Sequence, residues 1–153
     1  MIISFCGRAN FSENEEIKTK LLELLKNLQN GNPITFYLGG YGNFDLFAKN
    51  CAKEHQKAFP SSKVVFVSPY LGKWLEARRS YLENTYDEII FPEIENTPPR
   101  FAIIARNKWM ISNSDLVIAY VNTHYGGAYT SLLYAYKNKK PIINLYDGDY
   151  DLL

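Results

Sequence analysis

The sequence has few of the features that would assign it to a specialised class of protein. It has only two cysteines, Cys6 and Cys51, which are too few for a disulfide framework, and their apolar surroundings favour buried free thiols. No apolar run approaches the roughly 20 residues of a transmembrane helix. Residues 1–6 have no charged segment before a short apolar run, which predicts a strand and not a signal peptide. We therefore expect a cytosolic protein that has no membrane partner.

The chain also lacks an excess of either charge. It has 17 lysines and arginines against 16 acidic residues, so its formal net charge is +1. A broad nucleic-acid surface would need a strong basic excess or a clustered basic face, which argues against nucleic acid as a partner and leaves room only for a local basic pocket. No His, Cys and Asp cluster has metal-ligand spacing, and no Ser stands in a nucleophile elbow. We therefore predict no metal and no cofactor.

What the sequence does contain is a regular alternation of apolar runs and amphipathic segments. Hydrophobic residues make up 46% of the chain, which is enough for the core of one domain. The apolar runs predict strands at 2–6, 34–38, 64–67, 88–91, 115–121 and 141–145. Helical spacing predicts helices at 13–29, from 43 to just before Pro60, and at 72–84, 100–113 and 128–138. The pattern predicts one α/β domain, a Rossmann-like three-layer sandwich with a mostly parallel sheet and helices on both faces.

Smaller features carry predictions of their own. Ser12 and Glu15 are spaced as a capping box for the first helix. In the fourth helix, residues from Phe101 to Ser112 recur on one face, and the acidic tail 147–151 is expected to be loosely ordered. Residues 68–99 are the least regular part, and irregular loops often carry ligand selectivity.

The first candidate for a binding loop lies between the second strand and the second helix. Its sequence Leu-Gly-Gly-Tyr-Gly supplies Gly39, Gly40 and Gly42, and the helix begins near Asn43. Glycines allow close backbone approach, and the N–H groups at a helix start favour an anion such as phosphate. The pattern is neither the dinucleotide fingerprint nor a Walker A loop, and taken alone a tight turn explains it equally well. Asp45 could contact a ribose hydroxyl or cap its own helix.

A second glycine pair follows the fifth predicted strand. Here His124 and Tyr125 precede Gly126 and Gly127, and Thr130 lies in the first turn of the next helix. In a parallel sheet both loops leave the same carboxyl edge, where ligands bind, so two such loops favour a ligand site over two coincident turns. Thr130 could offer its hydroxyl to a phosphate or ribose, or be an ordinary helix residue. His124 could contact a phosphate or a base, or be a solvated loop histidine.

The helix before the fifth strand contributes basic side chains. Arg106 and Lys108 do not share a helix face, and we favour Arg106 for the ligand because a guanidinium matches phosphate or carboxylate in shape. A solvated basic helix end is the alternative. Gly7 and Arg8, directly after the first strand, complete the candidate ligand-binding residues.

These segments together resemble the SLOG superfamily, which is named for Smf/DprA and LOG proteins. LOG-type phosphoribohydrolases have a glycine loop after an early strand, an arginine in a middle helix, and a P-G-G-x-G-T-x-x-E motif that opens a later helix. Residues 38–42, Arg106 and residues 125–133 match these positions, so the resemblance covers nearly the whole chain. Residues 106–115 and 126–129 are similar to short SLOG proteins, for which the resemblance implies binding of a nucleotide ligand and no general reaction.

The chain departs from the LOG motif at three positions. Tyr125 replaces the proline, Tyr129 replaces the third glycine, and Leu133 replaces the glutamate. In LOG enzymes that acid is implied to work with the arginine on the N-glycosidic bond of a nucleoside monophosphate. A leucine cannot transfer a proton or stabilise an oxocarbenium-like centre, so we predict no catalytic residue at this position.

Three functions follow as hypotheses. The first is a binding module that senses or sequesters a nucleotide-derived signal, such as a nucleoside phosphate or a cyclic ADP-ribose-like molecule, because both glycine loops are kept and the glutamate is missing. SLOG domains sense ligands in bacterial anti-phage systems, so the resemblance implies a role in such defence or in phage counter-defence. The second is a hydrolase or transferase at an N-glycosidic bond that uses another acid, Asp45 or Glu76. DprA-like nucleic-acid binding, the third, fits poorly with a charge of +1.

Two further predictions concern surfaces. Glu76 with Arg78 and Arg79 could line the pocket or form a surface ion-pair cluster. The resemblance implies a homodimer or homotetramer, which Trp109 and the tyrosine-rich segment 129–136 could hold together; core packing is the alternative for Trp109.

Overall fold

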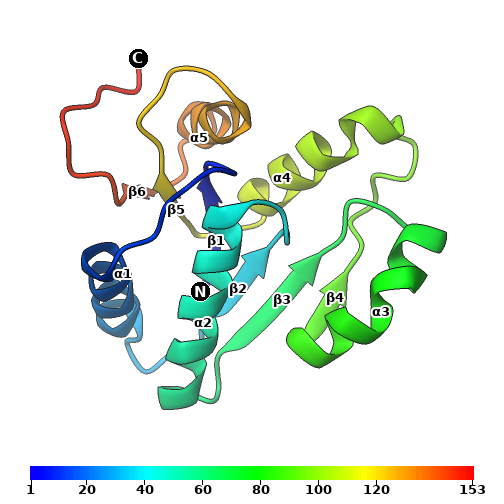
Figure 1. Cartoon of the computed structure of the whole chain (residues 1–153), viewed down its shortest axis with the longest axis horizontal. Coiled ribbons are helices and arrows are strands. Elements are labelled where there is room, and N and C mark those ends of the chain that lie inside the picture. Colours follow the sequence, from blue (N-terminus) through cyan, green and yellow to red (C-terminus); the bar gives the residue numbers. More distant parts are fainter.

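The predicted strands form one parallel sheet in the computed structural model, which describes residues 1–153 (Figure 1). Every pair of neighbouring strands runs parallel, which is the arrangement expected of near-continuous apolar runs buried on both faces. The strands are β1 (Ile2–Gly7), β2 (Thr35–Leu38), β3 (Lys63–Val67), β4 (Glu88–Ile90), β5 (Leu116–Tyr120) and β6 (Ile142–Asn144). Their order in the sheet is β4-β3-β2-β1-β5-β6.

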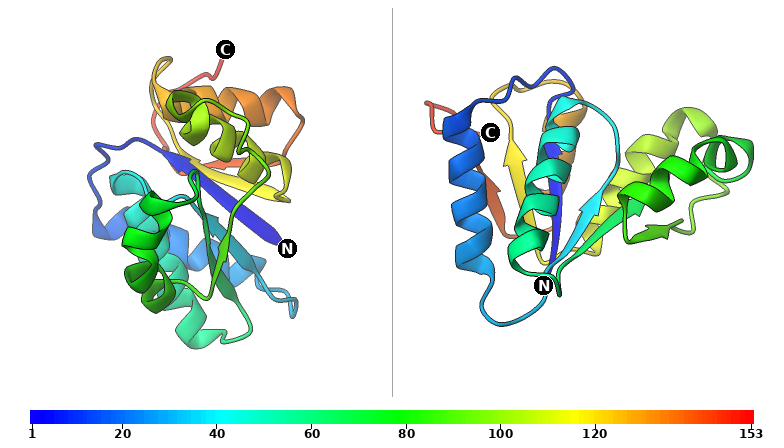
Figure 2. Two further views of the ribbon diagram at one scale, coloured as in Figure 1. Left: turned by 90° about the vertical axis from the view of Figure 1, so that its right-hand side faces the viewer. Right: turned by 60° about the horizontal axis from the view of Figure 1, so that its bottom comes forward.

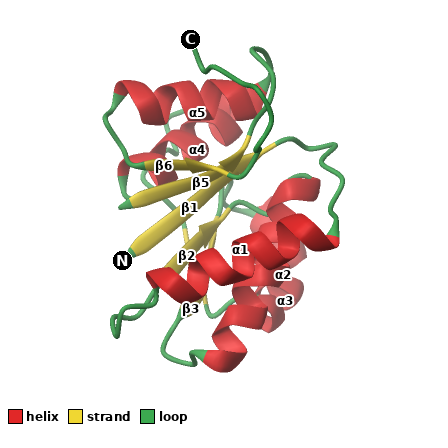
Figure 3. Cartoon of the chain, turned by 90° about the vertical axis from the view of Figure 1, so that its left-hand side faces the viewer, coloured by secondary structure: helices red, strands yellow, loops and turns green.

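Helices cover both faces of this sheet. They are α1 (Glu15–Leu28), α2 (Asn43–Ala58), α3 (Lys73–Thr85), α4 (Ala102–Ser112) and α5 (Gly127–Lys137), with a short 3-10 turn η1 (Pro99–Phe101) before α4. Figure 3 shows α1, α2 and α3 on one side of the strands and α4 and α5 on the other, and Figure 2 shows the same layers from two further sides. The predicted three-layer, Rossmann-like α/β fold is confirmed, and the sheet is entirely parallel.

The order of the strands reverses at β1. From β1 the chain moves outward through β2 and β3 to β4, and it then returns to place β5 on the other side of β1. In open parallel sheets the crevice at such a reversal, outside the carboxyl ends of the strands, is where ligands bind. The loops after β1, β2 and β5 all leave the sheet at this edge.

The core has one cluster on the α1–α3 face of the sheet and two on the α4–α5 face. On the α1–α3 face, Leu21 and Leu25 of α1 are fully buried and belong to a cluster of 21 residues. On the other face, Ile111 of α4 and Leu132 of α5 pack against Val117 of β5. Both cysteines are free and buried, and burial raises the pKa of each thiol to about 12. No helix is both long and apolar enough to cross a bilayer.

The structure corrects the predicted cap of the first helix. The N-cap is Asn14, whose Oδ1 accepts a hydrogen bond of 2.8 Å from the N–H of Ile17, and α1 begins at Glu15. The predicted capping box of Ser12 and Glu15 is therefore wrong. Asparagine and serine cap helices about equally well, and the sequence has one of each, Asn14 and Ser12, close to the start of the helix. Residue type alone therefore does not show which of the two is the cap.

The predicted apolar face of α4 does not coincide with its buried face. The buried residues are Ala102, Arg106, Met110 and Ile111. Phe101 and Ile104 remain 47% and 46% exposed. The helix turns Arg106 inward because the guanidinium finds hydrogen-bond acceptors at the ends of β2 and β3. Trp109 is half-buried and stacks on Tyr37, with ring centroids 5.6 Å apart, which is the core packing considered for it.

The C-terminal tail is held against the loop that precedes α5, contrary to the loose order expected of it. The Tyr150 hydroxyl donates a hydrogen bond of 2.6 Å to the carbonyl of Thr123, and the Tyr150 ring stacks on His124. The Tyr129 hydroxyl bonds the carbonyl of Leu152. Tyr150 of the tail and the rings of His124 and Tyr129 supply these contacts, and a prediction based on charge overlooks them.

Candidate functional site

A cavity of about 390 Å³ opens at the carboxyl edge of β1 and β2, between α4 and α5. Its volume lies within the about 300–1,000 Å³ of typical sites for small molecules. Five segments contribute to the lining: the end of β1, the loop after β2, the start of α2, and one face each of α4 and α5. Among the predicted residues, those that line it are Gly7, Gly39, Asp45, Arg106, Gly127 and Thr130.

Arg106 lines this cavity and is 2% exposed. Its Nη1 donates hydrogen bonds of 2.8 Å to the carbonyl oxygens of Gly39 and Val67, which end β2 and β3. Its Nε donates to Oδ1 of Asn107, whereas Nη2 has no hydrogen-bond partner in the protein. Burial lowers the pKa of Arg106 to about 10, and the nearby Asp45 opposes this shift. Arg106 therefore fixes the first glycine loop and keeps one donor free.

Asp45 occupies donors of that same loop. Its two carboxylate oxygens accept hydrogen bonds of 3.1 Å from the N–H of Gly39 and 2.6 Å from the N–H of Gly40. Burial raises the pKa of Asp45, although these two hydrogen bonds and the charge of Arg106 act in the opposite direction. The N–H groups of the loop therefore already have an acidic partner, the side chain of Asp45.

The first N–H groups of α2 are also taken. The N–H of Asn43 donates to the carbonyl of Ala9 at 2.9 Å, and the N–H of Phe44 donates to that of Arg8 at 3.4 Å. Sequence reasoning assigned phosphate binding to these groups, and four donors of the predicted cradle are instead satisfied within the protein. What remains of the loop is a wall of the cavity.

The N-terminus of α5 presents unoccupied donors. The first hydrogen bond of the helix runs from the N–H of Thr130 to the carbonyl of Gly126, and no side chain caps the helix. The N–H groups of Gly127, Ala128 and Tyr129 therefore have no acceptor in the protein. Such a cluster of donors, with the positive end of the helix dipole, suits an anion.

Gly127 has no steric or conformational requirement for glycine. A Cβ added there would meet no atom within 4 Å, and its φ is not positive. By contrast, a Cβ at Gly7 would lie 2.2 Å from the Phe44 ring, and Gly42 has a φ of +89°. The fold explains these two glycines but not Gly127, which lines the cavity.

Other predicted residues lie outside this cavity. Gly40 and Gly42 line a second cavity on the other side of the loop. The guanidinium of Arg8 lies 6.0 Å from the centre of the exposed Tyr125 ring, so these two join the loops after β1 and β5. Asn43 and Gly126 do not line the cavity, and His124 contacts the tail, with Nε2 2.5 Å from the carbonyl oxygen of Asp151.

Several residues that line the cavity were not predicted. Lys108 does so as well as Arg106, although the two lie on different parts of the helix surface. The remaining additions are mostly apolar, among them Phe5, Ile103, Ile104, Met110 and Ile111, with the polar Asn107 and Ser131. Ile104 lines the cavity, which explains why this apolar residue is exposed and does not pack in the core.

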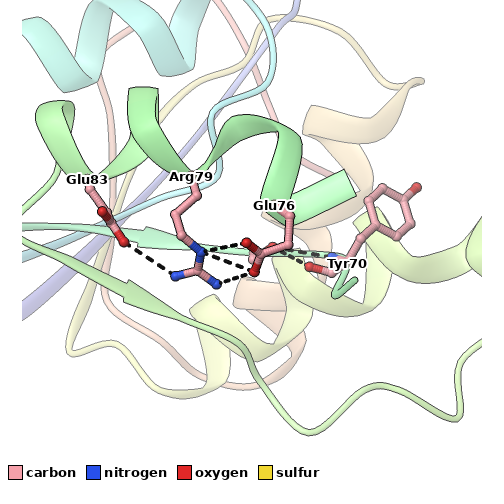
Figure 4. Close-up of polar contacts among 5 residues, drawn as sticks. Tyr70, Glu76, Arg79 and Glu83 are labelled. Carbon is pink, nitrogen blue, oxygen red and sulfur yellow. Dashed lines mark hydrogen bonds and ion pairs between the residues drawn. The ribbon is translucent and has the colours of Figure 1, made fainter. Parts of the chain in front are cut away.

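Glu76, the second residue considered as an alternative catalytic acid, lies outside the cavity. It forms an ion pair of 2.8 Å with Arg79, which also contacts Glu83 at 3.4 Å, and all three are exposed or half-exposed on α3 (Figure 4). Of the predicted cluster, Glu76 and Arg79 form a surface ion pair, whereas Arg78 lies over the Trp74 ring. None of the three lines the cavity. No group of three or more His, Cys, Asp or Glu is arranged to hold a metal ion.

Comparisons with known proteins show what the architecture is similar to. No family model and no curated protein sequence matches the chain. Among solved structures, DNA processing protein A from Helicobacter pylori, described for its single-stranded DNA binding mode, superposes with a TM-score of 0.61 at 20% identity, over 93% of this chain. The corresponding protein from Streptococcus pneumoniae gives a TM-score of 0.62 at 14% identity, over 92% of this chain.

A third similar structure is that of a cofactor carrier. The molybdenum cofactor carrier protein of Chlamydomonas reinhardtii superposes with a TM-score of 0.54 at 18% identity, over 92% of this chain and 73% of its own. This chain spans 63% and 48% of the two DNA processing proteins. The chain therefore has the Rossmann-like fold of DNA processing protein A and of the molybdenum cofactor carrier, the fold that its resemblance to SLOG proteins implies.

Proposed function

We propose that the chain binds a phosphate-bearing, nucleotide-derived ligand in the cavity between α4 and α5 and holds it without cleaving it. The observation that carries the proposal is the N-terminus of α5, where three backbone N–H groups have no acceptor and where Gly127, Ala128 and Thr130 line the cavity. A phosphate there would accept hydrogen bonds from these groups and gain from the helix dipole. The Thr130 hydroxyl, which now donates to the carbonyl of Gly126, lies within the same turn.

The rest of the cavity suits the remainder of such a ligand. Its apolar part, which includes Phe44, Ile103 and Met110, can cover the faces of a base. Asn107 and Ser131 offer hydrogen bonds to ribose or base edges. The free Nη2 of Arg106 and the ammonium group of Lys108 add positive charge for a second phosphate or a carboxylate.

The lack of a free carboxylate in the cavity supports binding of the ligand without cleavage. Asp45 is the one carboxylate among the lining residues, and both of its oxygens accept hydrogen bonds from the glycine loop. Leu133 stands where the LOG motif has its glutamate. A protein that retains the ligand site and lacks a free acid is suited to sensing or sequestering a nucleotide-derived signal.

The experiment is native mass spectrometry of the purified protein mixed with a panel of nucleoside monophosphates, nucleoside diphosphates and ADP-ribose derivatives. We expect one bound ligand per chain for at least one member of the panel, and the intact ligand recovered after heat release. The same spectra count subunits and so test the proposed homodimer or homotetramer. No adduct with any member of the panel would refute the proposal.

Cleavage at an N-glycosidic bond is the second candidate, favoured by one observation. Burial raises the pKa of Asp45, which lies beside Arg106 in the cavity, and a raised pKa is a common property of catalytic acids. If this candidate holds, incubation with nucleoside monophosphates releases free base, and Asp45→Asn abolishes the release. Chromatography that detects only intact nucleotide at high protein concentration excludes it.

A further inference from the structure

A second cavity of about 210 Å³ lies between α2 and α3, on the other side of the first glycine loop from the ligand cavity. The two cavities share only Asp45 among their lining residues. The second one is bounded by Gly40 and Gly42, by Leu46 and Lys49 of α2, and by α3 and the residues on either side of it. Its volume is below the about 300 Å³ at which sites for drug-sized ligands begin, so it has room for one or two rings.

Lys49 is the unusual residue of this cavity. Its relative exposure is only 9%, yet its ammonium group forms no hydrogen bond and no ion pair. The amine is not sealed off, since the one buried polar side-chain atom without a partner is Oγ of Ser62. The aliphatic stem of Lys49 is thus buried while its charged end keeps contact with solvent at the cavity. An anion in the cavity would replace water as the partner of the ammonium group.

The Tyr86 hydroxyl is a second unpartnered group in the same cavity. Tyr86 is 6% exposed, and its hydroxyl forms no hydrogen bond within the protein and keeps contact with solvent. Lys49 and Tyr86 therefore bring two donors into one small space. The only carboxylate nearby, that of Asp45, is already engaged by the N–H groups of Gly39 and Gly40.

The other walls are aromatic. The Phe66 ring is 6.4 Å from Trp74 with an interplanar angle of 15°, and it is 5.3 Å from Tyr86. The guanidinium of Arg78 lies over the Trp74 ring, 4.3 Å from its centre, and donates a hydrogen bond to the Trp74 carbonyl. Aromatic walls of this kind favour a planar ring by stacking or by edge-to-face contact.

We propose that this second cavity binds a small aromatic carboxylate, with its ring against Trp74 and Tyr86 and its carboxylate on the Lys49 ammonium group. The Tyr86 hydroxyl donates a second hydrogen bond to the same carboxylate. The proposal goes beyond the nucleotide site and does not depend on it, because different residues carry the two sites.

The test is isothermal titration calorimetry of the full chain with indole-3-carboxylate and, as a matched neutral probe, indole. We expect saturable binding of the carboxylate, at least about tenfold tighter than that of indole, which is the size of one or two charge-assisted hydrogen bonds. Lys49→Met should remove this preference. Lys57→Met is the control, because Lys57 is an exposed lysine on the same helix.

A conservative variant shows whether weaker binding results from the loss of one group or from misfolding. Tyr86→Phe keeps the ring and removes only the hydroxyl, so it should weaken indole-3-carboxylate by about threefold to tenfold and leave indole unchanged. Nucleotide binding at the α5 site should persist in both variants. Equal affinity of the wild-type chain for the two probes, no saturable binding of either, or a preference retained in a folded Lys49→Met variant would overturn the proposal.

Discussion

The guanidinium of Arg106 occupies the space that a side chain at Gly39 would need. A Cβ built at Gly39 would lie 2.7 Å from Cζ of Arg106, while Nη1 of Arg106 donates to the Gly39 carbonyl at 2.8 Å. The two residues are 67 positions apart, and their contact joins α4 to the end of β2. Position 39 therefore needs glycine because a larger residue would collide with Arg106, whether or not a ligand also needs the space.

The first prediction follows from this contact. Gly39→Ala should lower the free energy of unfolding by about 1–3 kcal/mol, because the methyl group displaces the guanidinium. In an Arg106→Ala background the same change should cost far less, since the obstructing atoms are gone. A double-mutant cycle by urea denaturation measures the difference, and additive effects would show that the contact is not the cause.

The second prediction concerns Asp45 and the glycine loop. Asp45→Ala leaves the N–H groups of Gly39 and Gly40 without acceptors, so their hydrogen exchange should accelerate by about tenfold or more. Exchange followed by NMR resolves the two amides. Asn50→Ala, an exposed change on the same helix, is the control. Unchanged protection of both amides in the Asp45 variant would contradict the geometry described here.

The third prediction is a pH dependence that arises from His55. Its ring Nε2–H donates a hydrogen bond of 2.8 Å to Oε1 of Gln29, and burial lowers its pKa below 6.5. The unfolded chain then binds the proton more tightly than the folded one, so stability is full above about pH 6.5 and falls as the pH drops toward the folded pKa. His55→Gln should reduce this slope in urea titrations between about pH 5 and pH 8.

The matched control for that experiment is His124→Gln, which changes the other histidine of the chain, an exposed one. It should leave the slope in place. A slope of the same size in the His55 variant would show that other groups cause the pH dependence.

Periodicity was sufficient to predict the architecture. Strands such as Val64 to Val67 are apolar throughout because both faces are covered, and the leucines of α1 repeat at helical spacing because one face is. The loops at the carboxyl edge followed from the parallel sheet. These features depend on local sequence, which explains why they could be read from it.

Hydrogen bonds between distant groups could not be predicted in this way. Nothing in the spacing of residues 38–45 indicates that the Asp45 carboxylate folds back onto Gly39 and Gly40. Likewise, Arg106 looked available for a ligand because its two carbonyl partners lie 39 and 67 residues away along the chain. Both contacts depend on the tertiary fold, and because of them we place the proposed phosphate at the second glycine loop and not at the first.

The most direct test of this account is the paired effect of Gly127→Ala on stability and on nucleotide affinity. A Cβ there meets no protein atom and φ is not positive, so the variant should be as stable as the wild type or gain about 0.4–1 kcal/mol. Calorimetric titration with the nucleotide that binds the wild type should show a loss of affinity of about tenfold or more, because the methyl group enters the space for the phosphate. Unchanged affinity in a fully folded Gly127→Ala variant would contradict the assignment of the anion to the N-terminus of α5.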